Sequence, residues 1–278
     1  MSADPRLTLA RPDLASRALE GIVPAGAYAD PTAMAVIAPG TGLYAKPDLA
    51  AERQDHLLFG EVFDVLEVKA GFAWGQARRD GYVGYVEAAA LAAPAPEPTH
   101  RVAAIRTYAF AEPSIKTQAS GPYSINALVA VEAREGRFAK AVGAGWFVEA
   151  HLSPIGRFES DPAAVAERFL GAPYLWGGRE SLGLDCSGLI QQALFACGRG
   201  CPRDTDLQQA LGHEIQSSEL ARGDLVFWKG HVAMVLDAER IIHANAHHMA
   251  VAVEPLAQAV ARIAAGATGL PTGYRRPV

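Results

Sequence analysis

One cysteine at the start of a predicted helix places the strongest constraint on this chain. The segment DCSG (185–188) is followed by the apolar-periodic run LIQQALFAC and by Gly198. Aspartate is a preferred residue just before a helix, and glycine commonly follows the last turn. We therefore predict a helix that begins at Cys186, ends before Gly198 and buries one apolar face. The fold must supply a second layer to cover that face.

Short β-rich runs downstream supply a candidate for that layer. They are DLVFW, HVAMVLD, RIIHA and AVAVEP, separated by turns. Upstream, Ser160-Asp161-Pro162 predicts the start of another helix, which AAVAERFL continues until Gly171. Residues 157–278 therefore predict an α+β domain, in which helices come first and an antiparallel sheet follows.

The amino-terminal part of the chain predicts β structure. Residues 33–88 alternate apolar and polar side chains over short spans, as in Val62–Val68, with glycines between the spans. The following stretch contains three prolines and breaks the pattern. We therefore predict an N-terminal segment at 1–32, a β module at 33–88, a linker at 89–100 and a second module at 101–156. The alternative for 89–100 is a segment that covers the edge of a sheet.

Two sets of residues recur between these modules. Tyr44-Ala45 and Pro47 parallel Tyr108-Ala109 and Pro113, and Gly84-Tyr85-Val86 parallels Gly145-Trp146-Phe147. This repetition favours two related small β modules, with an unrelated pair as the alternative.

The predicted position of Cys186 bears on its chemistry. The first turn of a helix has unpaired backbone N–H groups and the positive end of the helix dipole. Both stabilise an anion, and the thiolate is the form of cysteine that attacks carbonyls. The backbone N–H of Cys186 is also placed to donate to an oxyanion. We therefore expect Cys186 to be an activated nucleophile.

A thiol nucleophile needs a base that a third polar group holds in one orientation. His231 begins the run HVAMVLD directly after Lys229-Gly230, and His243 lies at the end of RIIHA. A hairpin of that length brings the two histidines side by side on adjacent strands. We predict that His231 accepts the proton and that His243 fixes its tautomer.

Charge and hydropathy exclude several classes of partner. The chain has 25 basic and 30 acidic residues, a formal net charge of −5, and no basic cluster that would favour nucleic acid. No apolar run approaches the roughly 20 residues of a membrane-spanning helix. The first residues lack the apolar stretch of a secretory signal peptide, so we expect a cytoplasmic protein without a membrane or nucleic-acid partner.

The cysteine count agrees with that expectation. Three cysteines fit reduced thiols better than a disulfide framework. Cys197 and Cys201 have no second ligand pair nearby, so we predict no metal and no cofactor. We expect Cys197 to lie in the core and Cys201 to be a loop thiol.

The motifs YLWGG, DCSG, PRDT, GDLVFW, HVAM and IIHA, in this order, resemble the NlpC family of bacterial cysteine peptidases. The resemblance covers about Asp161 to Pro277. The upstream modules resemble bacterial SH3-like domains. The expected fold is therefore multi-domain, with two small all-β SH3-like barrels followed by an α+β papain-like domain. The combination is similar to enzymes that cleave murein stem peptides between γ-linked D-glutamate and a diamino acid, during murein peptide recycling in the cytoplasm.

The resemblance implies roles for individual residues. Cys186 would be the nucleophile, His231 the base and His243 the polar third member. The pocket would recognise the free amino terminus of an L-Ala-γ-D-Glu unit. Its predicted residues are Tyr174 beside the reaction centre, Asp185, Glu61 and Tyr82 at the amine, with Tyr85 as a rival of Tyr82, and Ser187, Arg203, Asp204 and Thr205 at the D-glutamyl carboxylate and backbone. The family more often has serine at the position of Thr205.

Several of these residues have simpler interpretations. Asp185 could serve only as the helix cap, Arg203 and Asp204 could pair on the surface, and Glu61 could be a solvated strand residue. Trp176 is expected in the core. The functional alternatives are an amidase or acyltransferase on the same scaffold, and a non-catalytic protein that binds murein peptides.

Overall fold

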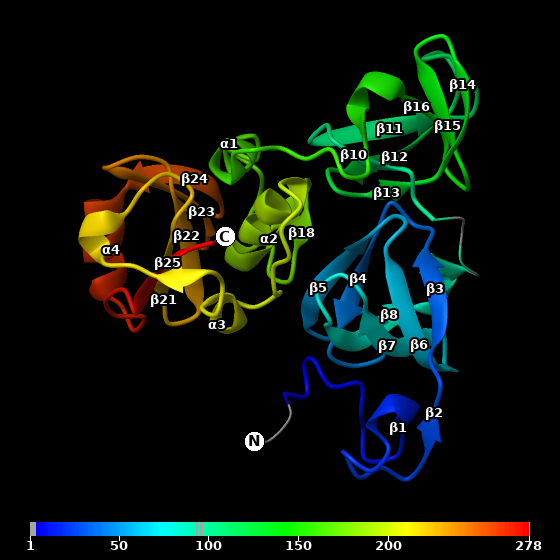
Figure 1. Cartoon of the computed structure of the whole chain (residues 1–278), viewed down its shortest axis with the longest axis horizontal. Helices are drawn as coiled ribbons and strands as arrows, with labels where there is room; N and C mark the ends of the chain where they lie inside the picture. The colour runs from blue at the N-terminus through cyan, green and yellow to red at the C-terminus, as the bar shows by residue number, and fades with distance from the viewer. Residues whose placement is uncertain (1–3, 93, 95–96, 278) are drawn as a thin grey trace. The chain divides into compact units, whose positions relative to one another are not determined.

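The computed structural model describes residues 4–92, 94 and 97–277, and the chain forms two compact units, Met1–Ile155 and Gly156–Val278. Figure 1 shows that the first unit consists almost entirely of strands, whereas the second combines helices with sheet. Among the described residues, no helix has both the length and the apolar character needed to cross a bilayer.

The first unit begins with a seven-stranded antiparallel sheet in the order β5-β4-β8-β7-β6-β3-β9. Along β6 the predicted alternation is confirmed, since Phe63 and Val65 are buried and their neighbours are partly exposed. The strands are β3 (Thr32–Val36), β4 (Gly40–Tyr44), β5 (Arg53–Leu58), β6 (Val62–Lys69), β7 (Phe72–Ala77), β8 (Val83–Glu87) and β9 (Leu91–Ala92). They are preceded by β1 (Ala15–Ser16), the 3-10 helix η1 (Arg17–Leu19) and β2 (Tyr28–Ala29).

A second set of strands follows within the same unit. It forms a five-stranded sheet, β12-β11-β16-β15-β14, and a three-stranded sheet, β13-β10-β17. The elements are β10 (His100–Val102), β11 (Arg106–Phe110), β12 (Ala119–Ser124), β13 (Leu128–Val129), β14 (Val131–Glu135), β15 (Phe138–Ala141), β16 (Gly145–Val148), the 3-10 helix η3 (Glu149–His151) and β17 (Leu152–Pro154).

The strand order of the first sheet recurs in the second. The order β5-β4-β8-β7-β6 corresponds strand by strand to β12-β11-β16-β15-β14. Tyr85 and Trp146 of the recurrent set pair with equivalent strands, because β4 meets β8 at Tyr44–Tyr85 and β11 meets β16 at Phe110–Trp146. Tyr108, the counterpart of Tyr44 in the sequence, is not the partner of Trp146. This repetition supports two related β modules. That the second module is an SH3-like barrel stays a prediction.

The segment predicted as a linker, 89–100, begins with ordered structure. The 3-10 helix η2 (Ala88–Ala90) leads into β9, which pairs with β3 at the edge of the first sheet. Leu91 is buried in the core of that sheet, because its side chain is the largest apolar one in the stretch. The start of this segment therefore agrees with the alternative prediction, a segment that covers the edge of a sheet. Residues 93, 95 and 96 of the predicted linker, and residues 1–3 of the predicted N-terminal segment, lie outside the described residues.

In the second unit, a six-stranded antiparallel sheet has the order β20-β25-β21-β22-β23-β24. Its strands are β20 (His213–Glu214), β21 (Leu225–Trp228), β22 (His231–Val235), β23 (Arg240–Asn245), β24 (Ala250–Pro255) and β25 (Gly273–Arg276). The other elements are α1 (Pro162–Glu167), β18 (Arg179–Glu180), β19 (Gly183–Leu184), α2 (Cys186–Ala196), α3 (Thr205–Gln208), the 3-10 helix η4 (Ser217–Glu219) and α4 (Leu256–Ala264). The α+β prediction is confirmed for this part of the chain.

One helix prediction needs correction, and the set of predicted helices was incomplete. The helix expected to reach Gly171 ends at Glu167, because the N–H groups of the next three residues bond three residues back and tighten the turn. Helix α4 was not predicted. It packs Leu256, Val260 and Ile263 on the apolar side of the sheet around Trp228, which is the spacing of an amphipathic helix.

Helix α2 packs against β22 and β23. The first residue of α2 is thereby placed next to the strands that carry the two candidate histidines, and this packing assembles the site.

Candidate active site

Cys186 is the first residue of α2 and is 7 % exposed. The side chain of Asp185 caps the helix by accepting a 2.8 Å hydrogen bond from the N–H of Gly188. The apolar residues of the run that follows are buried, and Gly198 has a φ of 75°, which ends the helix in a left-handed conformation. The predicted helix is therefore confirmed at both ends.

The surroundings of Cys186 favour the protonated thiol. Burial, followed by the charge of Asp185, raises its pKa to about 11. The hydroxyl of Thr205, 3.8 Å from the sulfur, and the backbone N–H of Val232 shift the pKa in the opposite direction but do not offset burial. The helix start therefore does not offset burial, and the base predicted from the sequence is needed to activate Cys186.

The two histidines lie together as predicted. Nε2 of His231 is 2.8 Å from Nδ1 of His243, across the adjacent strands β22 and β23. His231 lines a pocket of about 240 Å³ together with Cys186 and Tyr174. Burial, followed by the positive charge of Arg262, lowers the pKa of His231 to about 4. A neutral imidazole therefore shares the pocket with a neutral thiol.

Among the predicted substrate contacts, Asp185 forms hydrogen bonds with several residues of its own domain. Its Oδ1 accepts from Ser187 and its Oδ2 from the N–H of Gly177, at 3.2 and 2.9 Å. Arg203 donates to both oxygens, and also to the hydroxyl of Ser187 at 2.7 Å. Arg203 is 1 % exposed, so it lies behind these residues instead of facing the pocket. Because Arg203 is buried, it does not form a surface pair with Asp204.

The other candidates of this domain lie around the thiol. Thr205 begins α3, and Asp204 precedes it as the cap residue. Tyr174 is partly buried on the pocket wall, where burial, and then the charges of Cys186 and Asp185, raise its pKa. The structure thus brings Tyr174, Thr205 and Cys186 together.

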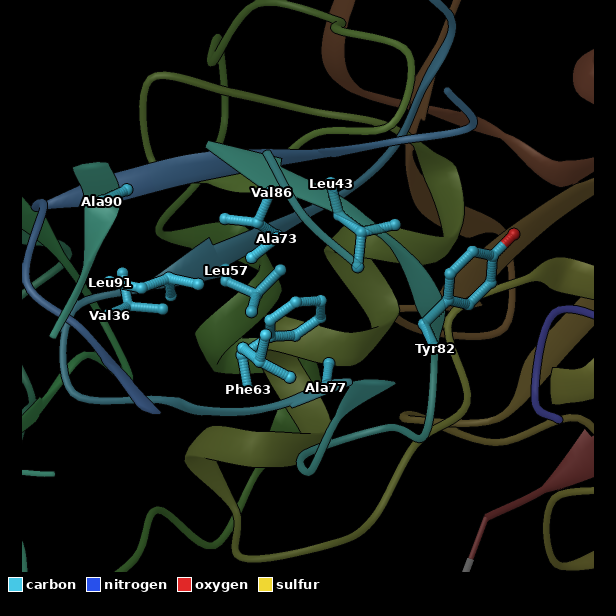
Figure 2. Packing of buried hydrophobic residues seen from close by; sticks show 11 residues of the cluster. Val36, Leu43, Leu57, Phe63, Ala73, Ala77, Tyr82, Val86, Ala90 and Leu91 are labelled. Atoms are coloured by element: carbon cyan, nitrogen blue, oxygen red, sulfur yellow. The ribbon is translucent and has the colours of Figure 1, made fainter. Parts of the chain in front are cut away.

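Glu61 and Tyr82 belong to the first unit. Glu61 is 2 % exposed, accepts from the N–H of Leu58 and pairs with Arg79 at 2.8 Å, so it is not a solvated strand residue. Tyr82 is 3 % exposed and belongs to the core of the first sheet. Figure 2 shows it at the edge of that cluster, with its hydroxyl pointing away from the other residues. The rival Tyr85 receives a hydrogen bond from Arg11. The roles of these residues in substrate binding stay predictions.

Two expectations about burial differ from the structure, whereas the loop position of Cys201 is confirmed. Trp176 is 60 % exposed, lies in a turn and is not a core residue. Cys197 is only partly buried, since it is the residue after the last turn of α2. Cys201 does lie in a loop, but it is buried.

Glu254 was not among the residues predicted from the sequence. Its Oε1 lies 2.7 Å from Nε2 of His243, and Arg262 from α4 donates to the same oxygen. The signal was a single acidic residue within the otherwise apolar run AVAVEP. Its significance depends on the register of β23 with β24, which the sequence did not supply.

Glu254 also belongs to the one potential metal-ligand group found among the described residues, in which side-chain ligand atoms of His243, His248 and Glu254 lie within 4.8 Å of one another. Two ligands of a tetrahedral zinc ion lie about 3.3 Å apart, given bonds of about 2.0 Å. The 2.7 Å between His243 and Glu254 is instead a hydrogen-bond distance. The arrangement fits a hydrogen-bonded pair better than a metal site.

Two family models match parts of this chain. The family model described as NlpC/P60 family matches residues 171–263, which include Cys186, His231 and His243. The model described as bacterial dipeptidyl-peptidase Sh3 domain matches residues 43–91.

The similar proteins include dipeptidyl-peptidases. Dipeptidyl-peptidase 6 of Lysinibacillus sphaericus is 26% identical over 76% of this chain and 86% of its own length. The γ-D-glutamyl-L-lysine dipeptidyl-peptidase of Bacillus cereus is 35% identical over 33% of this chain, but the match spans only 30% of that protein.

A solved structure, an NlpC/P60 family protein from Bacillus cereus, covers 88% of this chain and 99% of its own with a TM-score of 0.76 and 18% identity, which shows a shared fold. The thiol and the paired histidines lie inside the matched region, on a papain-like domain that an SH3-like domain precedes. The chain therefore contains an NlpC/P60 domain, of the kind found in a family of cysteine peptidases, and an SH3-like domain before it.

Proposed function

We propose that this enzyme hydrolyses the bond between γ-linked D-glutamate and an L-diamino acid in murein stem peptides whose amino-terminal L-alanine is free. The observation that carries the proposal is the position of Cys186 at the start of α2, beside the hydrogen-bonded pair His231–His243. Relatives named γ-D-glutamyl-L-lysine dipeptidyl-peptidases support the substrate class.

The reaction begins from a neutral pair. His231 accepts the thiol proton as the sulfur of Cys186 attacks the γ-carbonyl carbon of D-glutamate. Because burial raises the pKa of Cys186 and lowers the pKa of His231, proton transfer occurs only when substrate is in place. The resulting tetrahedral oxyanion lies at the start of α2, where the N–H of Cys186 can donate to it, an interaction worth about 3 kcal/mol.

His231 then returns the proton to the leaving amine of the diamino acid, and the carbon–nitrogen bond breaks. A water molecule attacks the thioester of the acyl-enzyme, with His231 as base, and releases L-Ala-γ-D-Glu. The second half of the cycle restores the thiol.

For substrate recognition, we assign the ammonium group of L-alanine to Asp185 and Tyr174, and the D-glutamyl carboxylate to the hydroxyls of Ser187 and Thr205. The geometry supports a changed role for Arg203, which holds Asp185 and Ser187 from behind. Asp204, at the start of α3, would contact the D-glutamyl backbone. Glu61 and Tyr82 complete the amine site in our proposal.

The test is mass spectrometry of L-Ala-γ-D-Glu-diaminopimelate after incubation with the enzyme, beside the same peptide with an acetylated amino terminus. We expect release of the dipeptide from the free peptide only, and none from either with Cys186→Ala. Equal cleavage of the acetylated peptide would remove Asp185, Glu61 and Tyr82 from the amine-binding role.

The two alternative functions give different results in this experiment. An amidase or acyltransferase would leave the γ-D-glutamyl bond intact but still react at Cys186 with another acyl donor. A non-catalytic binding protein would bind the peptide equally well with Cys186→Ala and release no product.

We further propose that the enzyme works in the cytoplasm on soluble murein fragments. All three cysteines are free thiols, which suits a reducing compartment. Cell fractionation tests this proposal, and recovery of the protein with the envelope would contradict it.

A further inference from the structure

A line of polar contacts crosses three strands of the catalytic domain. It starts at His231 on β22, passes through His243 on β23 and ends at Glu254 on β24, with heavy-atom distances of 2.8 and 2.7 Å. His243 is fully buried, and the side chain of Glu254 is 11% exposed. Burial of the His243 ring limits the access of water to both contacts.

The sheet register produces this line. His243 pairs with Ala252, so Glu254, two residues farther along β24, is its diagonal neighbour on the same face. The register of β22 with β23 pairs Met234 with Ile242, which makes His231 the diagonal neighbour of His243 on the other side. The three side chains are thus brought together by strand pairing.

Glu254 forms an ion pair with Arg262. Arg262 from α4 donates to the oxygen that faces His243, and its side chain is 29% exposed. An ionised carboxylate accepts hydrogen bonds and donates none. The contact with His243 therefore requires a proton on Nε2 of that ring.

One proton assignment then follows along the line. A neutral imidazole with its proton on Nε2 accepts at Nδ1, so Nε2 of His231 must donate to His243. The proton of His231 is thereby fixed on Nε2, and its Nδ1 is left as an acceptor for the thiol of Cys186. The opposite tautomer would present an N–H to the thiol and could not act as base.

We propose that Glu254 is a positioning residue that sets the tautomers of His243 and His231 through two successive hydrogen bonds, so that His231 faces Cys186 with an unprotonated Nδ1. The inference rests on the proposed use of Cys186 as nucleophile, but not on the identity of the substrate.

The charges around His243 are consistent with neutral rings. His231, Arg262, His248 and His247 face it from β22, α4 and the turn before β24, and with burial they lower its pKa. Glu254 supplies the only acidic contact that the structure gives this ring among the described residues. A carboxylate paired with Arg262 can orient His243 without protonating it.

The test reads the tautomers directly. In protein labelled with ¹⁵N-imidazole histidine, two-bond proton–nitrogen correlation spectra distinguish Nε2–H from Nδ1–H rings. We expect both His231 and His243 to be Nε2–H near neutral pH, with signals assigned from His231→Gln and His243→Gln. In Glu254→Leu, His243 should become a mixture of tautomers, whereas Glu254→Gln keeps an acceptor oxygen and most of the wild-type pattern.

Turnover of the murein peptide gives the second measurement. Glu254→Leu should lower kcat about 10- to 100-fold with little change in KM, because a misplaced proton disables the base without touching substrate. Glu239→Leu, at an exposed position of the same domain, is the matched control and should change neither measurement.

A wild-type His243 with its proton on Nδ1, or folded Glu254→Leu with unchanged tautomers, overturns the inference. If the wild-type enzyme does not cleave the peptide, the proposed function fails while the spectra still decide the role of Glu254.

Discussion

Arg203 places both terminal guanidinium nitrogens on the carboxylate of Asp185, at 3.0 Å from Oδ1 and 2.6 Å from Oδ2. The two side chains are 1% and 9% exposed. The same carboxylate caps α2, so this ion pair joins the loop before α3 to the helix that carries Cys186. A buried pair of this kind is sensitive to the loss of one partner, because the other charge is left without compensation.

Removing Arg203 alone should therefore destabilise the domain. We expect Arg203→Met to lower the free energy of unfolding by about 3 to 5 kcal/mol. The double variant Asp185→Asn with Arg203→Met should recover at least half of that loss, because it removes both charges. Urea unfolding measures both, and fully additive losses would contradict the interpretation.

The glycine of the DCSG segment should be intolerant of a side chain. A Cβ at Gly188 would lie 2.2 Å from the carbonyl oxygen of Gly178. Gly188→Ala should therefore displace the first turn of α2, lower stability by about 1 to 3 kcal/mol and reduce activity. Gly200→Ala, where a Cβ meets no atom within 4 Å, is the matched control and should behave like wild type.

The protonation of Cys186 gives a prediction about pH. Because its pKa is raised to about 11 while that of His231 is lowered to about 4, the free enzyme should contain almost no thiolate between about pH 4 and pH 9. The ultraviolet absorbance of thiolate, taken as the difference between wild type and Cys186→Ala, should appear only above about pH 9. A step in that difference near pH 4 would instead indicate a resting thiolate–imidazolium pair.

Acid should weaken the catalytic domain through the same histidine. The pKa of His231 in the folded state is about 4, whereas an unfolded histidine titrates near 6.5. The contribution of His231 to the free energy of unfolding is complete above the pKa of an unfolded histidine. Below that pKa, the free energy of unfolding falls by about 1 kcal/mol per pH unit, because the unfolded state gains a proton that the folded state does not bind. Urea midpoints between pH 7 and about pH 4.5 should thus fall more steeply for wild type than for His231→Gln.

Features with local signals were predictable from the sequence. Asp185, the apolar run and Gly198 mark both ends of α2 within a few residues, because caps and stops act over one helical turn. The alternation around Phe63 and Val65 likewise marks β6 without knowledge of its partners.

Features that depend on register or on small side chains were not predictable. Helix α4 contains several alanines and directly follows a β-rich run, so its amphipathic pattern was easily overlooked. The contact of Glu254 with His243 exists only in one pairing of β23 with β24. The burial that raises the pKa of Cys186 arises from tertiary packing, which the position of the residue in its helix does not reveal.

The place of β25 in the sheet also bears on how the enzyme is made. Although β25 lies near the end of the sequence, it pairs with both β20 and β21, and so fills a gap between two earlier strands. A ribosome releases those strands well before residues 273–276. The sheet that positions His231 therefore has an open edge during synthesis. We expect a nascent chain to expose that edge, and to remain inactive, until its last strand has emerged and docked.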